Sequence, residues 1–373
     1  MAELSKKLKY ARDRVGLTLA QVHERTEIGK SSLSEFENGK REPKFIQLQK
    51  LADLYRRSLE FFLGDQPIPQ EVVLWRERPV EGTQELEMEF LRLCRQYHNL
   101  EVWCDDQVDS WLPEPSVTRS RFGYPQAEAL AKSVRDQLQL GDRPGQELLR
   151  VLEEVCGVKI FYLSFQPTGT AASTNSPSYG RAILLNRNNI RWRRNFDLAH
   201  ELFHLLTWKI FRSNVDTTSC VAADDEEKLA TCFAGHLLMP HDALHTRLED
   251  EKEDGSISFE TLFDVAREFD VSVESLLWRI HYLYDMGPGN AERTKKNIER
   301  AESLRGLYEE REDSPPPKWP RRYHALAVKA LRHGEISLGR FAEYLGISRQ
   351  KAMSYIEREI EEDEKVEIAP VRC

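Results

Sequence analysis

Apolar residues recur at steps of three and four positions along most of the chain, and this spacing predicts a mostly helical protein. Residues 1–55 are predicted to form four short helices. Gly16 ends the first helix, and Thr18 is a good N-cap for the second. Ile28 and Gly29 make a short turn before the third helix. Two short helices joined by a tight turn can place the second of them in the major groove of DNA.

The rest of the chain combines amphipathic helices with a few short apolar strands. Helices are predicted over residues 84–104, 126–140, 147–155, 224–239 and, as a helical pair, 259–283. Strands are predicted over 158–165 and 181–186, and a last helical unit over 321–356. We therefore expect an α+β fold that is mostly α, with an N-terminal helix-turn-helix bundle, a middle domain holding a small sheet, and a C-terminal helical unit.

Composition narrows the class of protein. The chain has 373 residues, of which 40% are hydrophobic and 31% charged, a length that suggests two or three domains. Its apolar runs are too short for a transmembrane helix, and its start lacks the apolar stretch of a signal peptide, so we expect a cytoplasmic location. The six cysteines are scattered without a C-x-x-C pair, which indicates neither a zinc ribbon nor a disulfide framework.

Charge is distributed unevenly. The whole chain has a formal net charge of -9, yet residues 1–60 hold 13 Lys and Arg against 9 Asp and Glu. A small basic module on an acidic body is expected when one end alone binds a polyanion.

The stretch GLTLAQVHERTEIGKSSLSEFENGKREP, followed by LQKLADLY, resembles the lambda-repressor-like (XRE) helix-turn-helix family. The resemblance implies that residues 1–66 bind double-stranded DNA, with base reading from the start of the third helix. The resemblance implies that Gln21, Lys40 and Arg41 lie near backbone phosphates. It implies that the bases are read by Lys30, Ser31 and Ser34. A helical bundle used only for protein contacts is the alternative.

His200, Glu201 and His204 form an H-E-x-x-H pattern within FDLAHELFHLLTW. Helix positions four apart lie on one face, so both imidazoles can reach one metal ion. Glu201 is rotated by about 100° from His200 and can still reach a water on that ion. The alternative, two solvent-exposed histidines, fits poorly with the apolar residues that flank the pattern.

A catalytic zinc site needs three protein ligands and one open position. The helix predicted over 224–239 carries Glu226 and Glu227 in its first turn, and either carboxylate could be the third ligand. Glu201 would then act as the general base for hydrolysis of a peptide bond. We expect Zn²⁺, although two histidines and a carboxylate also suit Mn²⁺.

The pieces AILLN, RRNFDLAHELFH and EEKLATCFAGHLLMP resemble the ImmA/IrrE metallopeptidases over roughly residues 126–285. The ligand glutamate of that family lies three residues before an Ala, here Ala230, which selects Glu227. The resemblance implies a zinc-dependent endopeptidase that cleaves a repressor or antitoxin-like protein in stress response or mobile-element control. Phe203 stands where the family usually has Gly, and Thr231 where it has Asn.

Within this resemblance, the strand over 181–186 would be an edge strand that pairs with an extended substrate peptide, or else an internal strand. Arg191, Arg193 and Arg194 could stabilise the oxyanion, or they could form a solvated basic face. His236 could donate a proton to the transition state.

These predictions divide the chain into five parts. They are a DNA-binding domain (1–66), a helical connector (67–120), a metallopeptidase domain (121–290), a charged and proline-rich linker (291–320), and a C-terminal helical unit with an acidic tail (321–373). In the last unit, SLGRFAEYLGISRQKAMSYI again has a helix-turn-helix rhythm. We expect protein contact or dimerisation from it, with DNA contact through Arg349 and Lys351 as the alternative.

Two other functions remain open at this stage. One is a transcriptional regulator without proteolytic activity, whose metal site is structural or sensory. The other is a toxin–antitoxin or phage-control component that acts mainly by protein contact. A homodimer is compatible with all three.

Overall fold

The computed structural model describes residues 2–55, 57–64, 71–79, 81–108, 111–212, 222–252, 255–284, 290–308 and 315–361. The expected domain boundary at 66–67, Cys220, Cys373 and residues 362–373 of the acidic tail expected over 357–373 lie outside these residues. The chain separates into two compact units. The first comprises residues 1–95 and 108–316, and the second comprises residues 96–107 and 317–373.

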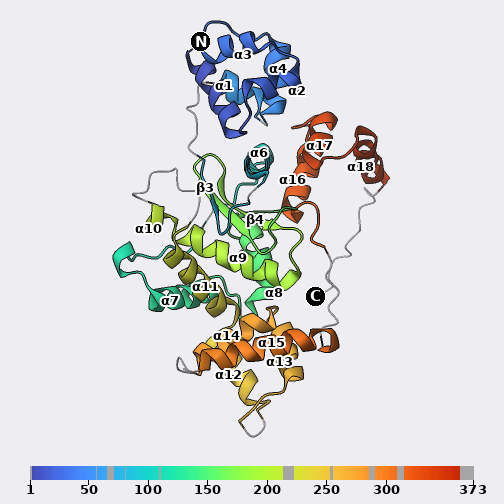
Figure 1. The fold of residues 1–373 in the computed structure, drawn as a ribbon. Helices are drawn as coiled ribbons and strands as arrows, with labels where there is room; N and C mark the ends of the chain where they lie inside the picture. The colour runs from blue at the N-terminus through green and yellow to red at the C-terminus, as the bar shows by residue number, and fades with distance from the viewer. Residues whose placement is uncertain are drawn as a thin grey trace. The chain divides into compact units, whose positions relative to one another are not determined.

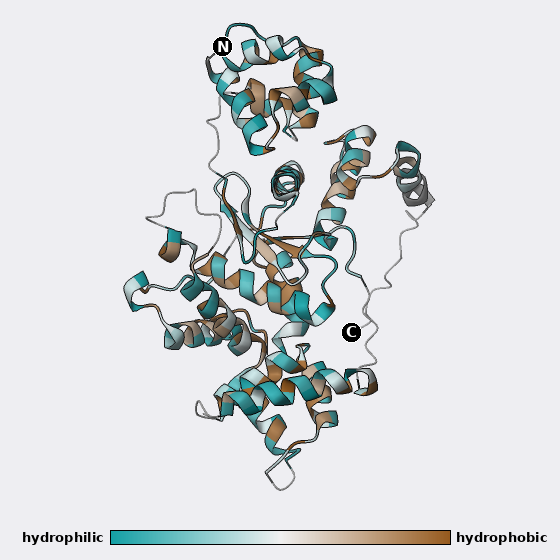
Figure 2. Ribbon diagram, in the orientation of Figure 1, coloured by the Kyte–Doolittle hydropathy of each residue, from teal (hydrophilic) through white to brown (hydrophobic). Residues whose placement is uncertain are grey.

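The N-terminal helices form the expected helix-turn-helix bundle (Figure 1). They are α1 (Ala2–Arg14), α2 (Leu19–Thr26), α3 (Lys30–Glu37), α4 (Phe45–Leu54) and α5 (Leu59–Leu63). The Thr18 side chain caps α2 by accepting a hydrogen bond from the backbone N–H of Gln21. Val22, Leu33 and Phe36 are buried between the helices, and Figure 2 shows that hydrophobic and hydrophilic segments alternate along the helices of this bundle.

A four-stranded sheet forms the centre of the middle region. Its strands are β1 (Val73–Trp75), β2 (Lys159–Leu163), β3 (Ala171–Ser176) and β4 (Gly180–Asn186), in the order β1-β3-β4-β2. β2 and β4 are parallel, whereas β3 is antiparallel to both of its neighbours. The structure therefore contradicts the expectation of an edge strand over 181–186, because β4 is hydrogen-bonded on both sides. The outer edge of β3 is paired with β1, a strand from the connector.

Helices pack around the sheet and against one another, and most of them contribute to one large hydrophobic core. They are α6 (Thr83–Trp103), α7 (Tyr124–Gln137), α8 (Pro144–Glu154), α9 (Arg191–Leu206), α10 (Trp208–Arg212), α11 (Asp224–Leu238), α12 (His241–Glu249), α13 (Phe259–Glu268), α14 (Val273–Leu283) and α15 (Ala291–Tyr308), with the short 3-10 helix η1 (Arg119–Arg121). α9 packs against β3 and β4, and α11 packs against α9 and α7 (Figure 1). The expected α+β, mostly α fold is confirmed.

Residues 291–308 differ from the linker expected there. They form α15, whose Ala301 is buried and whose Ile298 and Leu304 pack against the same core. Apolar residues at three- and four-residue steps within a highly charged segment explain both the helix and its packing.

The second unit is built from three helices and the end of α6. The helices are α16 (Arg321–Arg332), α17 (Leu338–Leu345) and α18 (Arg349–Glu361). Tyr323 of α16 is fully buried, and its hydroxyl oxygen lies 3.1 Å from the carbonyl oxygen of Tyr344. Trp103 of α6 stacks on Tyr344, with ring centroids 6.2 Å apart. These aromatic contacts form the core of the unit.

Candidate metal centre

Helix α9 holds the H-E-x-x-H residues inside the core. His200, Glu201 and His204 are each at most 1% exposed, because the apolar residues that surround them in the sequence bury this helix between the sheet and α11. The two imidazole rings lie 5.1 Å apart, as expected for positions one helical turn apart. One donor atom from each of the three residues lies within 4.8 Å of the others. Spacing along the helix therefore produces a compact donor cluster.

Helix α11 contributes the third candidate ligand. Glu227 Oε2 lies 2.9 Å from His200 Nε2, and Glu227 Oε1 lies 3.2 Å from His204 Nε2. The carboxylate thus faces the same ring nitrogen of both histidines. Two imidazoles and one carboxylate are a donor set that binds zinc in catalytic sites.

The neighbouring Glu226 contacts the opposite side of the His204 ring. Its Oε1 lies 2.8 Å from His204 Nδ1, and it also accepts a hydrogen bond from Arg212 Nη2 at 2.9 Å. A carboxylate at the second ring nitrogen fixes the tautomer and orientation of a metal-binding histidine. The residue pattern alone did not distinguish the two adjacent glutamates. In the structure, Glu226 contacts Nδ1 of His204 and Glu227 lies near Nε2.

Unpaired polar atoms gather where these donors meet. Among the described residues, His204 Nε2, Glu227 Oε1 and both carboxylate oxygens of Glu201 are buried and have no hydrogen-bond partner. Buried polar atoms without partners are costly and uncommon, so such a cluster needs an explanation. A divalent cation with a water molecule would satisfy these atoms, and the residues present therefore fit a zinc ion.

Burial and mutual contact shift the pKa values of the cluster in opposite directions. Burial lowers the pKa of His200 to about 3 and raises the pKa of Glu201 to about 7. Burial would also lower the pKa of His204, but the hydrogen bond with Glu226 and the close contact with the Glu227 carboxylate outweigh burial and raise that pKa to about 9. Burial opposes ionisation of Glu227, yet both histidines lower its pKa to about 2. Without metal, the imidazole of His204 is therefore positively charged at neutral pH, and it lies beside the ionised carboxylate of Glu227.

Arg76 is a neighbour of this cluster that sequence reasoning did not find. It follows β1, and its Nε lies 4.0 Å from Glu227 Oε2. Its Nη1 lies 3.4 Å from Oδ1 of the fully buried Asp197, which also accepts a hydrogen bond from Asn189 Nδ2 at 2.8 Å. Because Arg76 and Asp197 are 121 positions apart, only the pairing of β1 with β3 brings them together, and no local signal indicates it.

The other candidate side chains of the middle region lie against other partners. Arg191 pairs with Asp270, Arg193 pairs with Asp197, and Arg194 donates to the backbone oxygen of Asn189. His236 Nδ1 lies 3.8 Å from Oε2 of Glu128 in α7. These contacts do not involve the metal-facing atoms of His200, His204 or Glu227.

Phe203 stands where the ImmA/IrrE metallopeptidases usually have Gly, and its side chain is buried in the hydrophobic core. Its ring lies 5.8 Å from Phe122 and 5.6 Å from Phe233, and its exposed fraction is 0%. The ring also lies 5.8 Å from that of His204. The extra bulk therefore stabilises the packing of α9 and leaves His204 Nε2 facing Glu227.

In the N-terminal bundle, the residues implicated in DNA contact lie on and around α3. Lys30, Ser31 and Lys40 are exposed, and Ser34 is half-buried. Gln21 is exposed as well, but its Oε1 accepts a hydrogen bond from the backbone N–H of Thr18 at 2.8 Å. Gln21 therefore completes a capping box for α2, which leaves its amide nitrogen as the group that can reach a phosphate.

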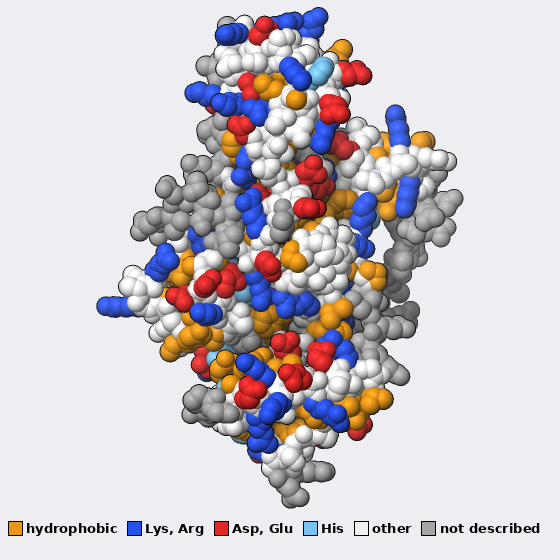
Figure 3. Space-filling view, in the orientation of Figure 1, with side chains coloured by type: hydrophobic (Ala, Val, Ile, Leu, Met, Phe, Trp, Pro, Cys, Tyr) orange, Lys and Arg blue, Asp and Glu red, His pale blue; other side chains and the backbone are white. Residues whose placement is uncertain are grey.

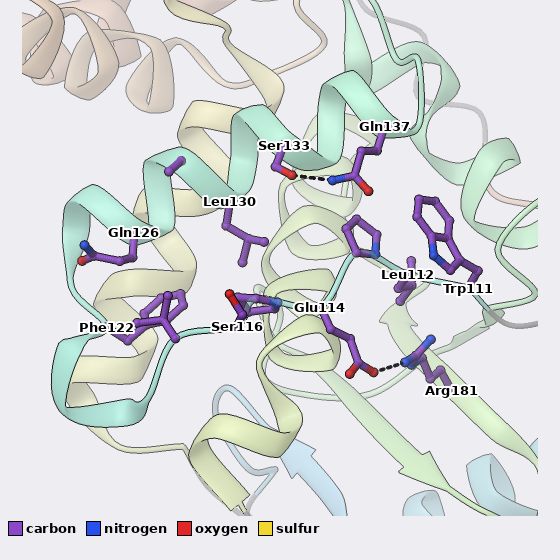
Figure 4. Close-up of a pocket in the computed structure, with 14 residues that line it drawn as sticks. Trp111, Leu112, Glu114, Ser116, Phe122, Gln126, Leu130, Ser133, Gln137 and Arg181 are labelled. Atoms are coloured by element: carbon purple, nitrogen blue, oxygen red, sulfur yellow. Dashed lines mark hydrogen bonds and ion pairs between the residues drawn. The ribbon is translucent and has the colours of Figure 1, made fainter.

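A pocket of about 680 Å³ lies on the same unit, apart from the metal centre (Figure 4). It is lined by the extended segment 111–117, by α7 and by Arg181, which pairs with Glu114 at 2.9 Å. None of the four metal-centre residues lines it. It therefore supplies no further group to the candidate metal centre.

Two segments of the first unit match families of known proteins. A family model described as helix-turn-helix matches residues 8–62, and a peptidase family model described as IrrE N-terminal-like domain matches residues 153–281. The HTH-type transcriptional regulator ImmR of Bacillus subtilis (strain 168) is 35% identical over 88 residues, which is 23% of this chain and 69% of ImmR. A solved structure of a Mycobacterium tuberculosis transcriptional regulator is 14% identical, with a TM-score of 0.31, over 50% of this chain and 52% of its own. This chain thus spans about half of that structure, and so low a score does not establish a shared fold.

Proposed function

Because this chain belongs to the XRE-type helix-turn-helix regulators and carries an IrrE N-terminal-like peptidase domain, we propose that it is a DNA-binding regulator with zinc-dependent endopeptidase activity. Its substrate would be a repressor or antitoxin-like protein, cleaved in stress response or mobile-element control. DNA as a partner would place it in the cytoplasm. Among the described residues, the structure contains no helix that could cross a membrane.

One observation carries the proteolytic part of this proposal. The Nε2 atoms of His200 and His204 face the carboxylate of Glu227, and the unpaired carboxylate of Glu201 lies in the same buried cluster. Two histidines, an acid ligand and a separate general base are the parts that metal-assisted hydrolysis of a peptide bond requires.

His200, His204 and Glu227 would hold the ion. When bound, zinc supplies a Lewis acid that polarises the scissile carbonyl and acidifies water. Glu201 takes the proton from the attacking water and then gives it to the leaving amine nitrogen. Because burial raises the pKa of Glu201 to about 7, its carboxylate is a stronger base than an exposed glutamate. Glu226 would keep His204 oriented through its Nδ1.

The conservative substitution Glu201→Gln tests the mechanism. It keeps the size of the side chain and all three ligands, so the variant should bind zinc with the affinity of the wild type. It removes the general base, and we expect cleavage of the natural partner protein to fall by a factor of at least about 100. Cleavage would be followed by mass spectrometry of the partner, and zinc by elemental analysis.

The exposed Glu260 of α13 provides a matched control, because Glu260→Gln changes the same functional group far along the chain from the metal residues. This variant should cleave like the wild type. Cleavage by Glu201→Gln at the wild-type rate would show that the proposed mechanism is wrong.

One observation favours a second candidate, a regulator with a sensory metal site. β1 already pairs with β3, so an extended peptide cannot add to that edge of the sheet while β1 remains in place. A sensor would need His200 and His204 but not Glu201. If Glu201→Gln left metal-dependent control of transcription unchanged and the wild type cleaved no partner, the sensory function would be favoured.

A further inference from the structure

We propose that residues 317–355 form a second DNA-binding helix-turn-helix, in which α18 is the recognition helix and double-stranded DNA is the ligand. The matching family model covers the N-terminal bundle at residues 8–62 and does not extend to this segment. The proposal is independent of the metal centre.

The second unit repeats the pattern of the N-terminal motif. α2 and α17 are both eight residues long, and in each case three residues separate that helix from the next, over 27–29 and 346–348. Thr18, Ile28 and Lys30 of the first motif correspond at the same spacing to three residues of the second. These are Ser337, Ile347 and Arg349.

The local geometry of the two motifs also agrees. Ser337 caps α17 by accepting a hydrogen bond from the backbone N–H of Arg340, as Thr18 caps α2. The turn begins in each motif with a left-handed residue, Glu27 at φ 62° and Gly346 at φ 55°. This shared conformation gives the two helices of each motif the sharp turn that a recognition helix requires.

The buried positions match as well. Val22 of α2 corresponds to Phe341 of α17, and both are 0% exposed. Leu33 of α3 corresponds to Ala352 of α18, at 2% and 0% exposure. Each third helix therefore buries the same side, and the same side of each remains free.

The free side of α18 presents residues suited to reading DNA. Arg349, Gln350 and Lys351 are exposed, and their side chains form no hydrogen bond or ion pair within the described part of the chain. By the repeat, Arg349, Gln350 and Met353 occupy the places of Lys30, Ser31 and Ser34. Arg makes bidentate contacts with guanine, and Gln does so with adenine, in the major groove.

Charge favours DNA over protein as the partner. Residues 317–361, up to the end of α18, contain nine Lys and Arg and five Asp and Glu, in a chain of net charge -9, and the acidic residues of α18 all follow its first two turns. Arg322 and Lys329 pair with Asp106, which follows α6 in the chain. The cations of α18 remain available, and Figure 3 shows Lys and Arg side chains over this group of helices. A protein-binding helix face would be more apolar, yet the first turns of α18 expose only Met353 as a large hydrophobic residue.

The test uses the full-length protein and a random-sequence DNA duplex of about 30 base pairs, long enough for several half-sites. To reduce the contribution of the N-terminal motif, all proteins carry Lys30→Ala and Ser31→Ala together with Lys40→Ala and Arg41→Ala, which remove the cations assigned to phosphates. Adding Arg349→Ala and Lys351→Ala should weaken binding about tenfold or more and reduce the slope of log affinity against log salt by up to about two. Fluorescence anisotropy over a salt series measures both quantities.

The control pair, Lys295→Ala and Arg300→Ala, removes two exposed charges from α15 and should change the affinity less than about twofold. Circular dichroism would confirm that the variants remain folded, as expected for exposed positions. Sedimentation would report their oligomeric state.

Unchanged affinity and salt slope in the folded Arg349→Ala, Lys351→Ala protein would overturn the proposal. The same would follow if the control pair had an equal effect, since the loss would then reflect net charge alone. Dissociation of an oligomer without any loss of DNA affinity would show instead that this face binds a second copy of the chain.

Discussion

At the scale of single residues, the metal centre depends on which nitrogen and which carboxylate face each other. Glu226 and Glu227 are adjacent in sequence, but they contact opposite sides of His204. The residue pattern indicated a carboxylate in the first turn of the second helix and left both glutamates open. The rotation of α11 against α9 decides between them, and this rotation is a property of packing that a local pattern does not contain.

The pKa of His204 leads to a prediction about metal binding. That pKa is raised to about 9, so at pH 8 the metal-free protein holds a proton on His204, while Glu201, with a pKa of about 7, is mostly ionised. A metal ion needs the neutral imidazole, so binding must release this proton. We expect release of about one proton per zinc at pH 8, and an affinity that rises about tenfold per pH unit until His204 is deprotonated near pH 9.

Isothermal titration calorimetry in buffers of different ionisation enthalpy counts the released protons. The Glu201→Gln variant lacks the other group that titrates in this range, and it should release no more protons than the wild type, because the charge of Glu201 helps to raise the pKa of His204. Binding at pH 8 without release of a proton would contradict the assigned state of His204.

At the scale of elements, the sequence predicted the helices and strands that are determined by residues close together in the chain. The helices follow the periodicity of apolar residues, and β2 and β4 follow short apolar runs. β3 was missed because its sequence, AASTNS, is small and polar, and β1 was missed because it is only three residues long. Both strands exist through pairing with distant segments, and the internal position of β4 is decided by the same pairing.

One buried ion pair connects elements that are separate in the sequence. The carboxylate of Glu71, just before β1, accepts hydrogen bonds from Arg57 at 2.8 Å and from Arg95 of α6 at 2.7 Å. Burial raises the pKa of Glu71, but the charges of Arg95 and Arg57 outweigh burial and hold that pKa below its ordinary value. Glu71 thus fixes the segment that leads into β1.

Replacing Glu71 with Gln should lower the free energy of unfolding by about 3 kcal/mol at neutral pH, because it leaves the buried Arg57 and the half-buried Arg95 without a countercharge. Since the folded pKa of Glu71 is lowered, this contribution is present at neutral pH and is lost as the pH falls through that pKa. Urea unfolding at several pH values measures the difference. It should shrink in acid, and a difference that grew in acid would contradict the account.

Glu81→Gln is the control for this experiment. Glu81 is exposed, so its replacement should change the free energy of unfolding by less than about 0.5 kcal/mol. An equal effect of both substitutions would show that the loss at Glu71 does not come from the buried ion pair.

At the scale of the whole molecule, the chain joins a DNA-binding motif to a peptidase-like domain. The XRE-type motif and the H-E-x-x-H helix were both predictable, because each depends on residues close together in sequence. The neighbourhood of the metal centre was not, because Arg76 and Asp197 meet only in the folded chain. We propose that the N-terminal motif brings the peptidase domain to an operator, where its protein substrate is bound.

The central claim is that His200, His204 and Glu227 bind one metal ion while Glu226 only orients His204. It is tested most directly by the zinc affinity of the full-length protein, measured by competition with a chromophoric chelator, for the Glu227→Gln and Glu226→Gln variants. We predict that Glu226→Gln weakens binding by about 10- to 100-fold, as the loss of an orienting partner does, and that Glu227→Gln weakens it much further. Zinc binding by Glu227→Gln as tight as that of the wild type would contradict the assignment.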